Sequence, residues 1–292
     1  MNTWIVLYNP LAGNGAASEK VKKLEQLLPG DALYFHNMLE IKDYGAFFSD
    51  MPDGAELIVC GGDGTLNRFL NDTDDVRPDC DIYYYPSGSG NDFARDIGAS
   101  AESAPVCIDR YIERLPRIRI NGEEHSFING IGYGIDGYCC EKGDELRGSS
   151  GEVNYTAIAV KGLLFHYKPT GATVTVDGVE HRFEKVWLAP TMIGRYYGGG
   201  MMPTPEQNRL NPDGTVSVML FYGSSKIKSL VVFPSIFKGE HIKHNEMVKV
   251  LRGKNITVRF DEPRPLQIDG ETISGVQEYS VAACEEKVLQ PA

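Results

Sequence analysis

The sequence lacks the features that mark several classes of protein. No apolar run in its 292 residues reaches the roughly 18–20 residues that a membrane-spanning helix requires. The N-terminus has no basic region, and its apolar stretch is too short for a signal peptide, so we expect a cytoplasmic protein. The six cysteines include no C-x-x-C pair, which argues against zinc and thioredoxin-like sites.

Positive charge is in the minority, with 29 lysines and arginines against 40 acidic residues and a net charge of −11. This balance argues against nucleic-acid binding. Positive charge nevertheless gathers in residues 226–259, where eight basic and two acidic residues give a local charge of +6. The segment also has an apolar stretch, so peripheral contact with an anionic lipid surface is one interpretation. A core helix with a solvated end is the other.

Three glycine-rich loops each follow a short apolar strand in the first 92 residues: Asn9–Gly15, Gly61–Thr65 and Pro86–Asp92. Glycine lets a backbone approach a phosphate closely. Any one of these loops could be a simple turn, but three in consecutive units favour a nucleotide phosphate site. Asp63 is placed to hold Mg²⁺, often through water, and Thr65 is placed to cap the following helix.

Strands and helices alternate up to about residue 115, which predicts a parallel, doubly wound α/β domain over residues 1–116. Beyond it, the pattern changes to hairpins, so we expect a mainly antiparallel β-sandwich over 117–283, with the tail, about 284–292, free to pack back on the first domain. Two helices interrupt the second domain, near 155–165 and 229–238. The expected strands of this domain are 118–120, 126–129, 173–176, 179–183, 186–190, 216–221, 255–260 and 266–268.

Two carboxylates end the strand at residues 266–268, in the sequence Asp269-Gly270-Glu271. Asp-Gly is a common hairpin turn. The same two carboxylates could also accept a proton from a hydroxyl group and steer a metal ion. The loop Tyr196–Pro203 is rich in glycine and apolar residues, and it is either a flexible connection or a mobile lid or lipid-facing wall.

The motifs together resemble the diacylglycerol kinase catalytic-domain family, which includes sphingosine kinases and bacterial soluble lipid kinases. The family pattern runs N-P-x-S-G, G-G-D-G-T, P-x-G-T-x-N-D-x-A-R and a late D-G-E. In this chain the motifs are Asn9–Gly13, Gly61–Thr65, Pro86–Arg95 and Asp269–Glu271, and Phe127–Asp136 is similar to the start of the family's second domain. The resemblance covers essentially the whole chain. It implies a nucleotide-binding domain like those of phosphofructokinase and NAD kinase.

The resemblance also implies roles for individual residues. Asp63 and Asp92 would belong to a carboxylate–water–Mg²⁺ network. Asp269 would be the general base toward the lipid hydroxyl, and Glu271 would assist it or orient the metal. A second, structural Mg²⁺ would be bound by Leu210, Asp213 and Thr215, with main-chain carbonyls from the first and last. The residues expected around ATP are Asn9, Pro10, Gly13, Asn37, Gly61, Gly62, Asp63, Gly64, Thr65, Asn67, Ser89, Asn91 and Asp92.

The chain departs from the family pattern at several positions. Ala12 stands where the family usually has serine, so one hydroxyl donor to phosphate is missing. Ser89 replaces a threonine, and Asn37 stands where a threonine is expected to contact ATP. Asp109 is the nearest match to a third aspartate of the Mg²⁺ network. Asp213 is the one clear carboxylate at the structural metal site.

The resemblance implies an ATP- and Mg²⁺-dependent lipid kinase, and we expect diacylglycerol to be its substrate. An NAD kinase is the alternative enzyme, because it shares the Gly-Gly-Asp-Gly-Thr motif. A non-catalytic regulator that binds lipid or nucleotide is an alternative of a different class. It is favoured by Ala12 and by the single carboxylate at the structural metal site. An exposed sheet edge could support a homodimer.

Overall fold

The computed structural model describes residues 1–12, 17–88, 90–150, 158, 161–162 and 166–284. The chain divides into two compact units, Met1–Glu113 and Arg114–Ala292. The expected boundary between residues 116 and 117 stays a prediction. Within the described residues, no helix is both long enough and apolar enough to span a membrane.

Unit 1 is built on a five-stranded sheet in the order β2-β1-β3-β4-β5. The first four strands in this sheet are parallel, as the alternating pattern predicts, and the short β5 runs antiparallel to β4. The strands are β1 (Thr3–Tyr8), β2 (Ala32–Asn37), β3 (Ala55–Gly61), β4 (Ile82–Pro86) and β5 (Val106–Cys107). The fold-class prediction is therefore confirmed for this unit.

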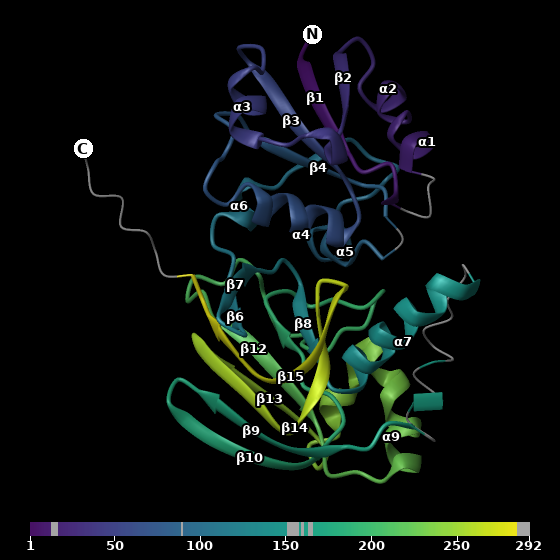
Figure 1. Cartoon of the computed structure of the whole chain (residues 1–292), viewed down its shortest axis with the longest axis vertical. Helices are drawn as coiled ribbons and strands as arrows, with labels where there is room; N and C mark the ends of the chain where they lie inside the picture. The colour runs from purple at the N-terminus through teal and green to yellow at the C-terminus, as the bar shows by residue number, and fades with distance from the viewer. Residues whose placement is uncertain (13–16, 89, 151–157, 159–160, 163–165, 285–292) are drawn as a thin grey trace. The chain divides into compact units, whose positions relative to one another are not determined.

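Alternate residues of the unit 1 strands point to opposite sides of the sheet, and side chains from helices pack against both faces. Trp4, Ile58 and Tyr85 pack with Val21 and Leu24 in one cluster. On the other face, Tyr84 contacts Phe93 of α5 edge to face. The helices are α1 (Ala17–Val21), α2 (Leu24–Leu27), η2 (Met38–Glu40), α3 (Tyr44–Ser49), α4 (Asp63–Asp72), α5 (Asp92–Ile97) and α6 (Asp109–Ile112) (Figure 1).

The helical segments after β1 and β2 are short. Within the described residues α1 and α2 follow β1, and the 3₁₀ turn η2 and the helix α3 follow β2. The Gly61–Thr65 loop is shorter than predicted, because α4 already begins at Asp63 with Gly62 as its N-cap. Thr65 therefore lies inside the helix and does not cap it, which corrects the sequence prediction.

Unit 2 is dominated by antiparallel strands, in the order β13-β12-β11-β8-β14-β15-β6-β7, with β9 and β10 joined through β14. The long β14 pairs with β9 in its first half and with β8 in its second, and β-bulges between the two halves allow it to serve both partners. The strands are β6 (Arg117–Ile120), β7 (Glu123–Ser126), β8 (Gly130–Tyr133), β9 (Thr170–Val176), β10 (Val179–Val186), β11 (Thr191–Met192), β12 (Val216–Phe221), β13 (Val248–Gly253), β14 (Asn255–Ile268) and β15 (Glu271–Ala282).

The helices of unit 2 lie to one side of its sheet (Figure 1). They are α7 (Ile135–Ser150), α9 (Lys226–Val232), η4 (Phe233–Lys238) and η5 (Glu240–Lys243). Ile135 of α7, Val232 of α9 and Ile236 of η4 share one apolar core with Met219 and Phe221 of β12. This layer of helix on sheet agrees with the predicted β-rich domain.

Several details of unit 2 differ from the sequence predictions. The expected strand at 126–129 is wrong, because β7 ends at Ser126 and the next strand starts at Gly130. The strands β13 and β15 and helix α7 were not predicted. The helix expected near 155–165 lies mostly outside the described residues. The Tyr196–Pro203 loop is a packed turn, with Tyr197 and Met201 buried and paired with each other.

Candidate functional site

The described residues that follow strands β1, β3 and β4 of unit 1 lie at the carboxyl edge of the parallel sheet. Tyr8 is in register with Asn37 on one side and Cys60 on the other, and Cys60 is in register with Tyr85. The residues that follow these strands therefore leave the sheet side by side. In open parallel sheets ligands bind at this edge, where the strand order reverses, and here that point lies between β1 and β3.

Two of the loops touch through their glycines. A Cβ atom built on Gly88 would lie 2.3 Å from the Cα of Gly62, and one built on Gly62 would lie 3.1 Å from the Cα of Gly88. The amide of Ser87 also donates to the carbonyl of Gly61 at 3.0 Å. Side chains at these positions would push the loops apart, so the pattern Gly-Gly-Asp followed later by Ser-Gly is required for the two backbones to meet.

Asp63 joins the same two loops electrostatically. Its carboxylate accepts hydrogen bonds from the amides of Asp92 at 2.9 Å and Phe93 at 2.8 Å. Asp63 stands in the first turn of α4, yet it caps the first turn of α5, because the N-cap residue Asn91 is left-handed and its side chain does not cap. The Asp63 side chain therefore ties the start of α5 to the start of α4.

Asp92 and Tyr84, which lie near the loops, are each held by a polar contact. Asp92 is buried at 2% exposure and lies 3.4 Å from the guanidinium of Arg95. The Tyr84 hydroxyl donates to the Gly61 carbonyl at 3.0 Å. Burial, followed by the charge of Asp63, raises the pKa of Tyr84 far above its usual value. The phenol therefore stays neutral under the loop and supports it.

Two buried polar atoms beside these loops have no hydrogen-bond partner within the described residues: the Asn91 Oδ1 and the Ser87 Oγ. Leaving such atoms unpaired costs about 1–3 kcal/mol each unless a ligand or water satisfies them. Acceptor atoms such as Asn91 Oδ1, together with the carboxylates of Asp63 and Asp92, suit the water shell of Mg²⁺. The residues present therefore fit a phosphate with its metal.

The other residues expected around ATP lie at the same edge but with local partners. Asn9 accepts from the amide of Leu11 at 2.9 Å, in the turn that contains Pro10. The Asn37 side chain accepts from the amide of Leu39 and donates to Glu40. Asn67 is buried on α4 and accepts from the Asn71 side chain. Gly64 is inside α4, and Gly13 and Ser89 lie outside the described residues.

A hollow of 380 Å³ lies beside Asn37 at the β2 edge of the sheet. Its walls include the His36 and Phe47 rings, which contact each other edge to face, with centroids 5.1 Å apart. Asn37 is the one residue expected around ATP that lines it. The remaining lining residues are Phe35, Glu40, Ile41, Lys42 and Asp43.

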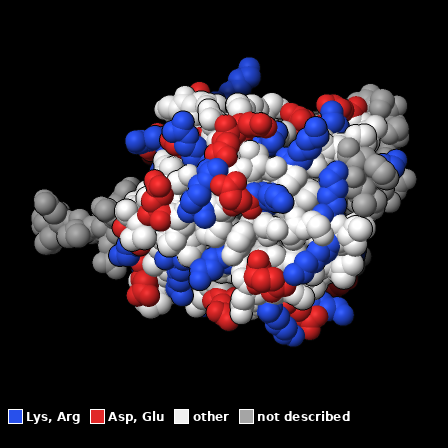
Figure 2. Space-filling view, turned by 90° about the horizontal axis from the view of Figure 1, so that it is seen from below, with Lys and Arg blue, Asp and Glu red and all other residues white. Residues whose placement is uncertain are grey.

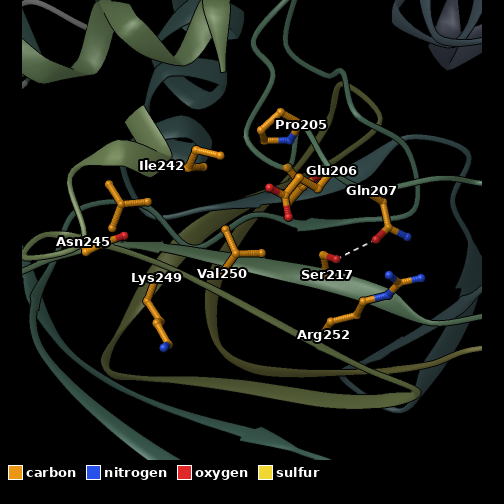
Figure 3. Close-up of a pocket in the computed structure, with 11 residues that line it drawn as sticks. Pro205, Glu206, Gln207, Ser217, Ile242, Asn245, Lys249, Val250 and Arg252 are labelled. Atoms are coloured by element: carbon orange, nitrogen blue, oxygen red, sulfur yellow. Dashed lines mark hydrogen bonds between the residues drawn. The ribbon is translucent and has the colours of Figure 1, made fainter. Parts of the chain in front are cut away.

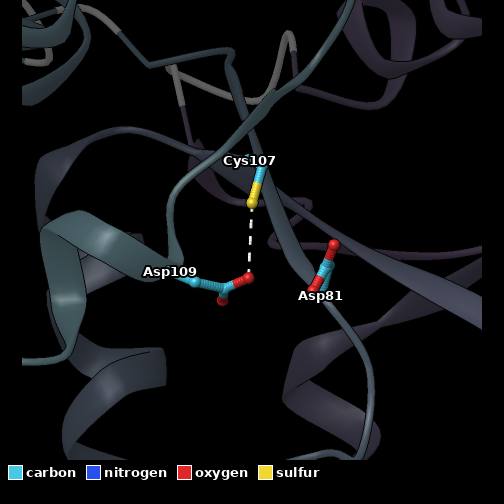
Figure 4. A group of neighbouring side chains, drawn as sticks. All are labelled: Asp81, Cys107 and Asp109. Carbon is cyan, nitrogen blue, oxygen red and sulfur yellow. Dashed lines mark hydrogen bonds between the residues drawn. The ribbon is translucent and has the colours of Figure 1, made fainter.

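Asp109 lies beside the amino end of β4, whereas the phosphate loops follow the carboxyl ends of the parallel strands. Its carboxylate accepts from the amide of Ile82, the first residue of β4, and from the thiol of Cys107 (Figure 4). With Asp81 these residues form a group whose possible ligand atoms lie within 4.8 Å of one another. The phosphate loops follow the other end of β4. The assignment of Asp109 as the third aspartate of the Mg²⁺ network is therefore wrong.

In unit 2, Asp269 occupies a socket of backbone amides. One carboxylate oxygen accepts from Ile128 at 2.7 Å, and the other accepts from Asn129 at 2.9 Å and Gly130 at 3.1 Å. The residue is 8% exposed and has a positive φ of 46°, as the first position of the Asp-Gly hairpin turn requires. Three amide donors fix the orientation of the carboxylate and favour its ionised form.

Glu271 follows two residues later, at the start of β15, and its side chain is exposed. Sequence reasoning missed a cation at this place, Arg209. Its guanidinium donates to the Ile128 carbonyl at 2.8 Å and to the Asn129 side chain at 3.1 Å, so it holds the same segment that holds Asp269. No local pattern marks Arg209, because it lies far from this segment in the sequence.

The predicted structural metal site does not fit Mg²⁺. The Thr215 carbonyl already accepts from the Gln207 amide at 2.8 Å and the Asn211 amide at 2.9 Å. Asn211 also accepts from the Thr215 amide, so side-chain amides close this loop. Asp213 is exposed, and Leu210 is 41% exposed. Both lone pairs of the Thr215 oxygen are used, and a single carboxylate remains for a cation that prefers several oxygen ligands.

We therefore expect the loop to be stable without metal. A chelator should leave the melting temperature of the nucleotide-free protein unchanged, and Asn211→Ala should lower the free energy of unfolding by about 1–3 kcal/mol, because buried partners lose their hydrogen bonds. Thermal unfolding with and without Mg²⁺ measures both. A melting temperature that rises with Mg²⁺ in the wild type, and not in Asp213→Asn, would instead show an occupied site.

A second hollow of 380 Å³ lies in unit 2 beside β12 and β13 (Figure 3). Ser217 donates to Gln207 within it, and Lys249, Arg252 and Glu206 give it mixed charge. Neither Asp269 nor Glu271 lines this hollow, so it is separate from the predicted catalytic residues. The other lining residues are Thr204, Pro205, Ile242, Asn245, Val248 and Val250.

Two family models match the chain. The diacylglycerol kinase catalytic domain matches residues 3–117, and the YegS C-terminal NAD kinase beta sandwich-like domain matches residues 129–286. The diacylglycerol kinase of Mycobacterium tuberculosis (strain ATCC 25618 / H37Rv) is 28% identical over 271 residues, covering 86% of this chain and 83% of that protein. The diacylglycerol kinase of Bacillus subtilis (strain 168) is 24% identical over 277 residues, covering 91% and 88%.

The fold is also similar to a solved structure. The crystal structure of a diacylglycerol kinase from Bacillus anthracis str. Sterne matches with a TM-score of 0.60 at 19% sequence identity, covering 97% of this chain and 94% of that chain. At this identity the likeness concerns the fold alone.

Proposed function

Because the chain belongs to the diacylglycerol kinase catalytic-domain family of lipid kinases, we propose that it transfers the γ-phosphate of ATP, with Mg²⁺, to the hydroxyl group of diacylglycerol and forms phosphatidic acid. The observation that carries the proposal is the contact of the glycine loops at Gly62 and Gly88, beside the unpaired Asn91 Oδ1 and Ser87 Oγ. The close backbone contact, with unpaired polar atoms beside it, supports a site for a phosphate chain and its metal, and phosphoryl transfer depends mainly on such positioning.

Each unit supplies one part of the proposed reaction. In unit 1 the loop backbone would cradle the phosphates, and Asp63 and Asp92 would hold the waters of Mg²⁺, which neutralises the charge that develops on the phosphates. In unit 2 the Asp269 carboxylate would take the proton of the lipid hydroxyl, while the oxygen of that hydroxyl bonds to the γ-phosphorus. The bond from that phosphorus to the bridging oxygen breaks, and ADP leaves with the electron pair. Glu271 would assist the proton transfer.

The test is the transfer of labelled γ-phosphate from ATP to diacylglycerol in mixed micelles, with NAD⁺ present as a second acceptor. Labelled phosphatidic acid is the expected product. Label on NAD⁺ would show that the protein is an NAD kinase and not a lipid kinase. The second family model, whose name mentions NAD kinase, is the reason for including this acceptor. ATP binding without labelling of either acceptor, or of a wider lipid panel, would support a binding regulator.

We further propose that α9 and η4 contact the membrane that holds the substrate. Ile227 and Val231 lie one turn apart on α9 and are 75% and 73% exposed, and Phe237 of η4 is 48% exposed. Lys226, Lys228 and Lys238 flank them. We call Ile227, Val231 and Phe237 the apolar patch. An apolar face bordered by lysines suits an anionic membrane surface.

The contact is narrower than the whole segment 226–259. Val232 and Ile236 are buried, and β13 is paired within the sheet. Lys228 and Lys243 form ion pairs with Glu246 and Glu240. Figure 2 shows basic and acidic side chains interspersed over the face of the molecule that it draws. The binding energy would therefore come mainly from the apolar patch, with the lysines adding to it.

The double variant Ile227→Asp/Val231→Asp should bind vesicles that contain anionic lipid about tenfold or more weakly, because two exposed apolar side chains lose their insertion energy. Co-sedimentation with vesicles measures this directly. Val179→Asp is the matched control, because Val179 is 59% exposed on β10, away from the patch in sequence. Equal loss in both variants, or none in the double variant, would contradict the docking proposal.

A further inference from the structure

A buried acid lies behind the turn that carries the proposed catalytic carboxylates. Asp136, in the first turn of α7, is 9% exposed, and its Oδ2 accepts from the Gln267 side chain at 2.9 Å. A Cβ on Gly132 would lie 1.7 Å from this Oδ2 and 2.6 Å from the Gln267 Nε2. Glycine at position 132 is thus what leaves room for the Asp136–Gln267 hydrogen bond.

The hydrogen-bond chain continues from Gln267 into the turn. Gln267 is 3% exposed, and its Oε1 accepts from the backbone amide of Gly270 at 2.7 Å. Gly270 stands between Asp269 and Glu271. A buried amide side chain with a donor on one side and an acceptor on the other has one orientation that satisfies both neighbours.

We propose that Asp136 is a positioning residue which, through Gln267, holds the Asp269–Glu271 turn in its catalytic conformation. This inference rests on the proposed function, because it takes Asp269 and Glu271 as the groups that receive the proton. Asp136 itself need touch neither substrate nor metal. Its ionised carboxylate is a pure acceptor, so it fixes the Gln267 Nε2 toward α7 and the Gln267 Oε1 toward Gly270.

Protonation would remove this constraint. A protonated Asp136 carries an O–H donor beside its remaining acceptor, so the Gln267 amide can also bind it by turning its oxygen toward α7. In that turned state the Gln267 Nε2 faces the Gly270 N–H, two donors oppose each other, and the hydrogen bond to the turn is lost. Misplacement of a reacting group by about 1 Å can lower a rate roughly a hundredfold.

The environment of Asp136 places this change near neutral pH. Burial raises the pKa of Asp136 to about 6, and the hydrogen bond from Gln267 opposes the rise. Gly132 of β8, Gln267 of β14 and Gly198 of the neighbouring loop face it without charge. Cys139, on α7 itself, is the titratable group that senses its charge, and burial keeps that thiol neutral by raising its pKa to about 12.

The same shift has an opposite consequence for stability. An acid whose pKa is higher in the folded than in the unfolded state favours folding at low pH, and this stabilisation is lost as pH rises from about 4 to about 6. Ionised Asp136 thus lowers stability above pH 6, where it supports catalysis. A residue that served only folding would instead stabilise the folded state in its ionised form.

The experiment compares Asp136→Ala, Gln267→Ala and the double variant in the phosphate-transfer assay at pH 8. We expect kcat to fall about tenfold in each single variant, with KM for ATP unchanged and no further loss in the double variant, because both residues act along one path. Wild-type activity in Asp136→Ala, or losses that multiply in the double variant, would overturn the proposal. Asp136→Asn should show no activity limb near pH 6 and should be at least as stable as the wild type at pH 8.

A control and a second measurement separate this inference from the proposed function. Ser274→Ala removes another bond to α7, from the Ser274 hydroxyl to Glu141 at 2.6 Å, and should leave kcat unchanged. Amide hydrogen exchange at Gly270 needs no activity. It should be slow in the wild type at pH 8 and faster in Asp136→Ala. If the wild type transferred phosphate to no acceptor, the proposed function would fail, while exchange at Gly270 would still support or overturn the Asp136–Gln267 link.

Discussion

Replacing Asp269 by asparagine is expected to preserve ATP binding and to remove most phosphate transfer. General-base catalysis by a positioned side chain contributes roughly 10²–10⁴-fold to a rate. The carboxylate is held by the amides of Ile128, Asn129 and Gly130, so its position does not depend on the substrate. Transfer of labelled phosphate and ATP binding, measured on the same preparation, give the two numbers. Turnover equal to the wild type would refute the assignment of the base.

The Asp269→Asn variant also changes the socket, because its amide group would present a donor to backbone donors. Glu271→Gln is therefore the matched control. Glu271 is exposed on the same turn, and the change leaves the socket intact. We expect a smaller loss of kcat in Glu271→Gln, with unchanged thermal stability. If Glu271→Gln lost more activity than Asp269→Asn, the two carboxylates would exchange roles, and Asp269 would be the residue that orients the turn.

The phosphate loops could be predicted from the sequence because their signals are local. A buried apolar strand, then glycine, then an acid describes a strand-to-helix junction within about ten residues. The parallel sheet follows from the alternation of such junctions, and the register of β1, β2, β3 and β4 brings their ends together as expected. The Asn121-Gly122 and Asp177-Gly178 turns were predictable for the same reason, and both have the positive φ values that this turn type requires.

The contacts that build the site could not be predicted, because they join distant segments. Asp63 was expected to hold a metal, but its cap on α5 depends on a backbone amide 29 residues away. Asp269 finds its amides near residue 129, at a separation of 140 residues. Hydrogen bonds of this kind leave no periodicity in the sequence. Gly132 gave no signal either, since a glycine that makes room for Asp136 looks like any other glycine.

The errors in the second half have a physical cause as well. The strands β13 and β15 are rich in charged and polar residues on their exposed faces, which weakens the apolar pattern used to find strands. Helix α7 contains Gly137 and Gly143, poor helix formers, although a Cβ on Gly137 would lie 2.0 Å from the Pro265 carbonyl oxygen. Close packing of α7 on β14 thus requires a residue that local propensity counts against the helix.

Replacing Gly88 by alanine should weaken ATP binding at least tenfold and lower the free energy of unfolding by about 1–3 kcal/mol. The new Cβ would lie 2.3 Å from the Cα and 2.8 Å from the N of Gly62. Both atoms belong to the backbone, so relief requires the two phosphate loops to separate. The unpaired Asn91 Oδ1 would move with them, since the Asn91 side chain donates to the Gly88 carbonyl at 2.9 Å. Calorimetric titration with ATP and thermal unfolding measure the two effects.

Two further glycines of unit 1 turn this into a graded test. A Cβ on Gly62 would meet the Gly88 Cα at 3.1 Å, so Gly62→Ala should have the same effects in weaker form. A Cβ on Gly45, within α3, would lie 3.2 Å from a carboxylate oxygen of Asp43, which caps α3 by accepting from the Ala46 amide, so Gly45→Ala should disturb that cap at most and leave ATP binding unchanged. The order Gly88, Gly62, Gly45 follows from the clash distances and from the atoms met, which are backbone atoms for the first two glycines and a side chain for the third. If Gly88→Ala bound ATP as the wild type does, the contact between the two loops would not be part of the nucleotide site, and the phosphates would have to be held elsewhere.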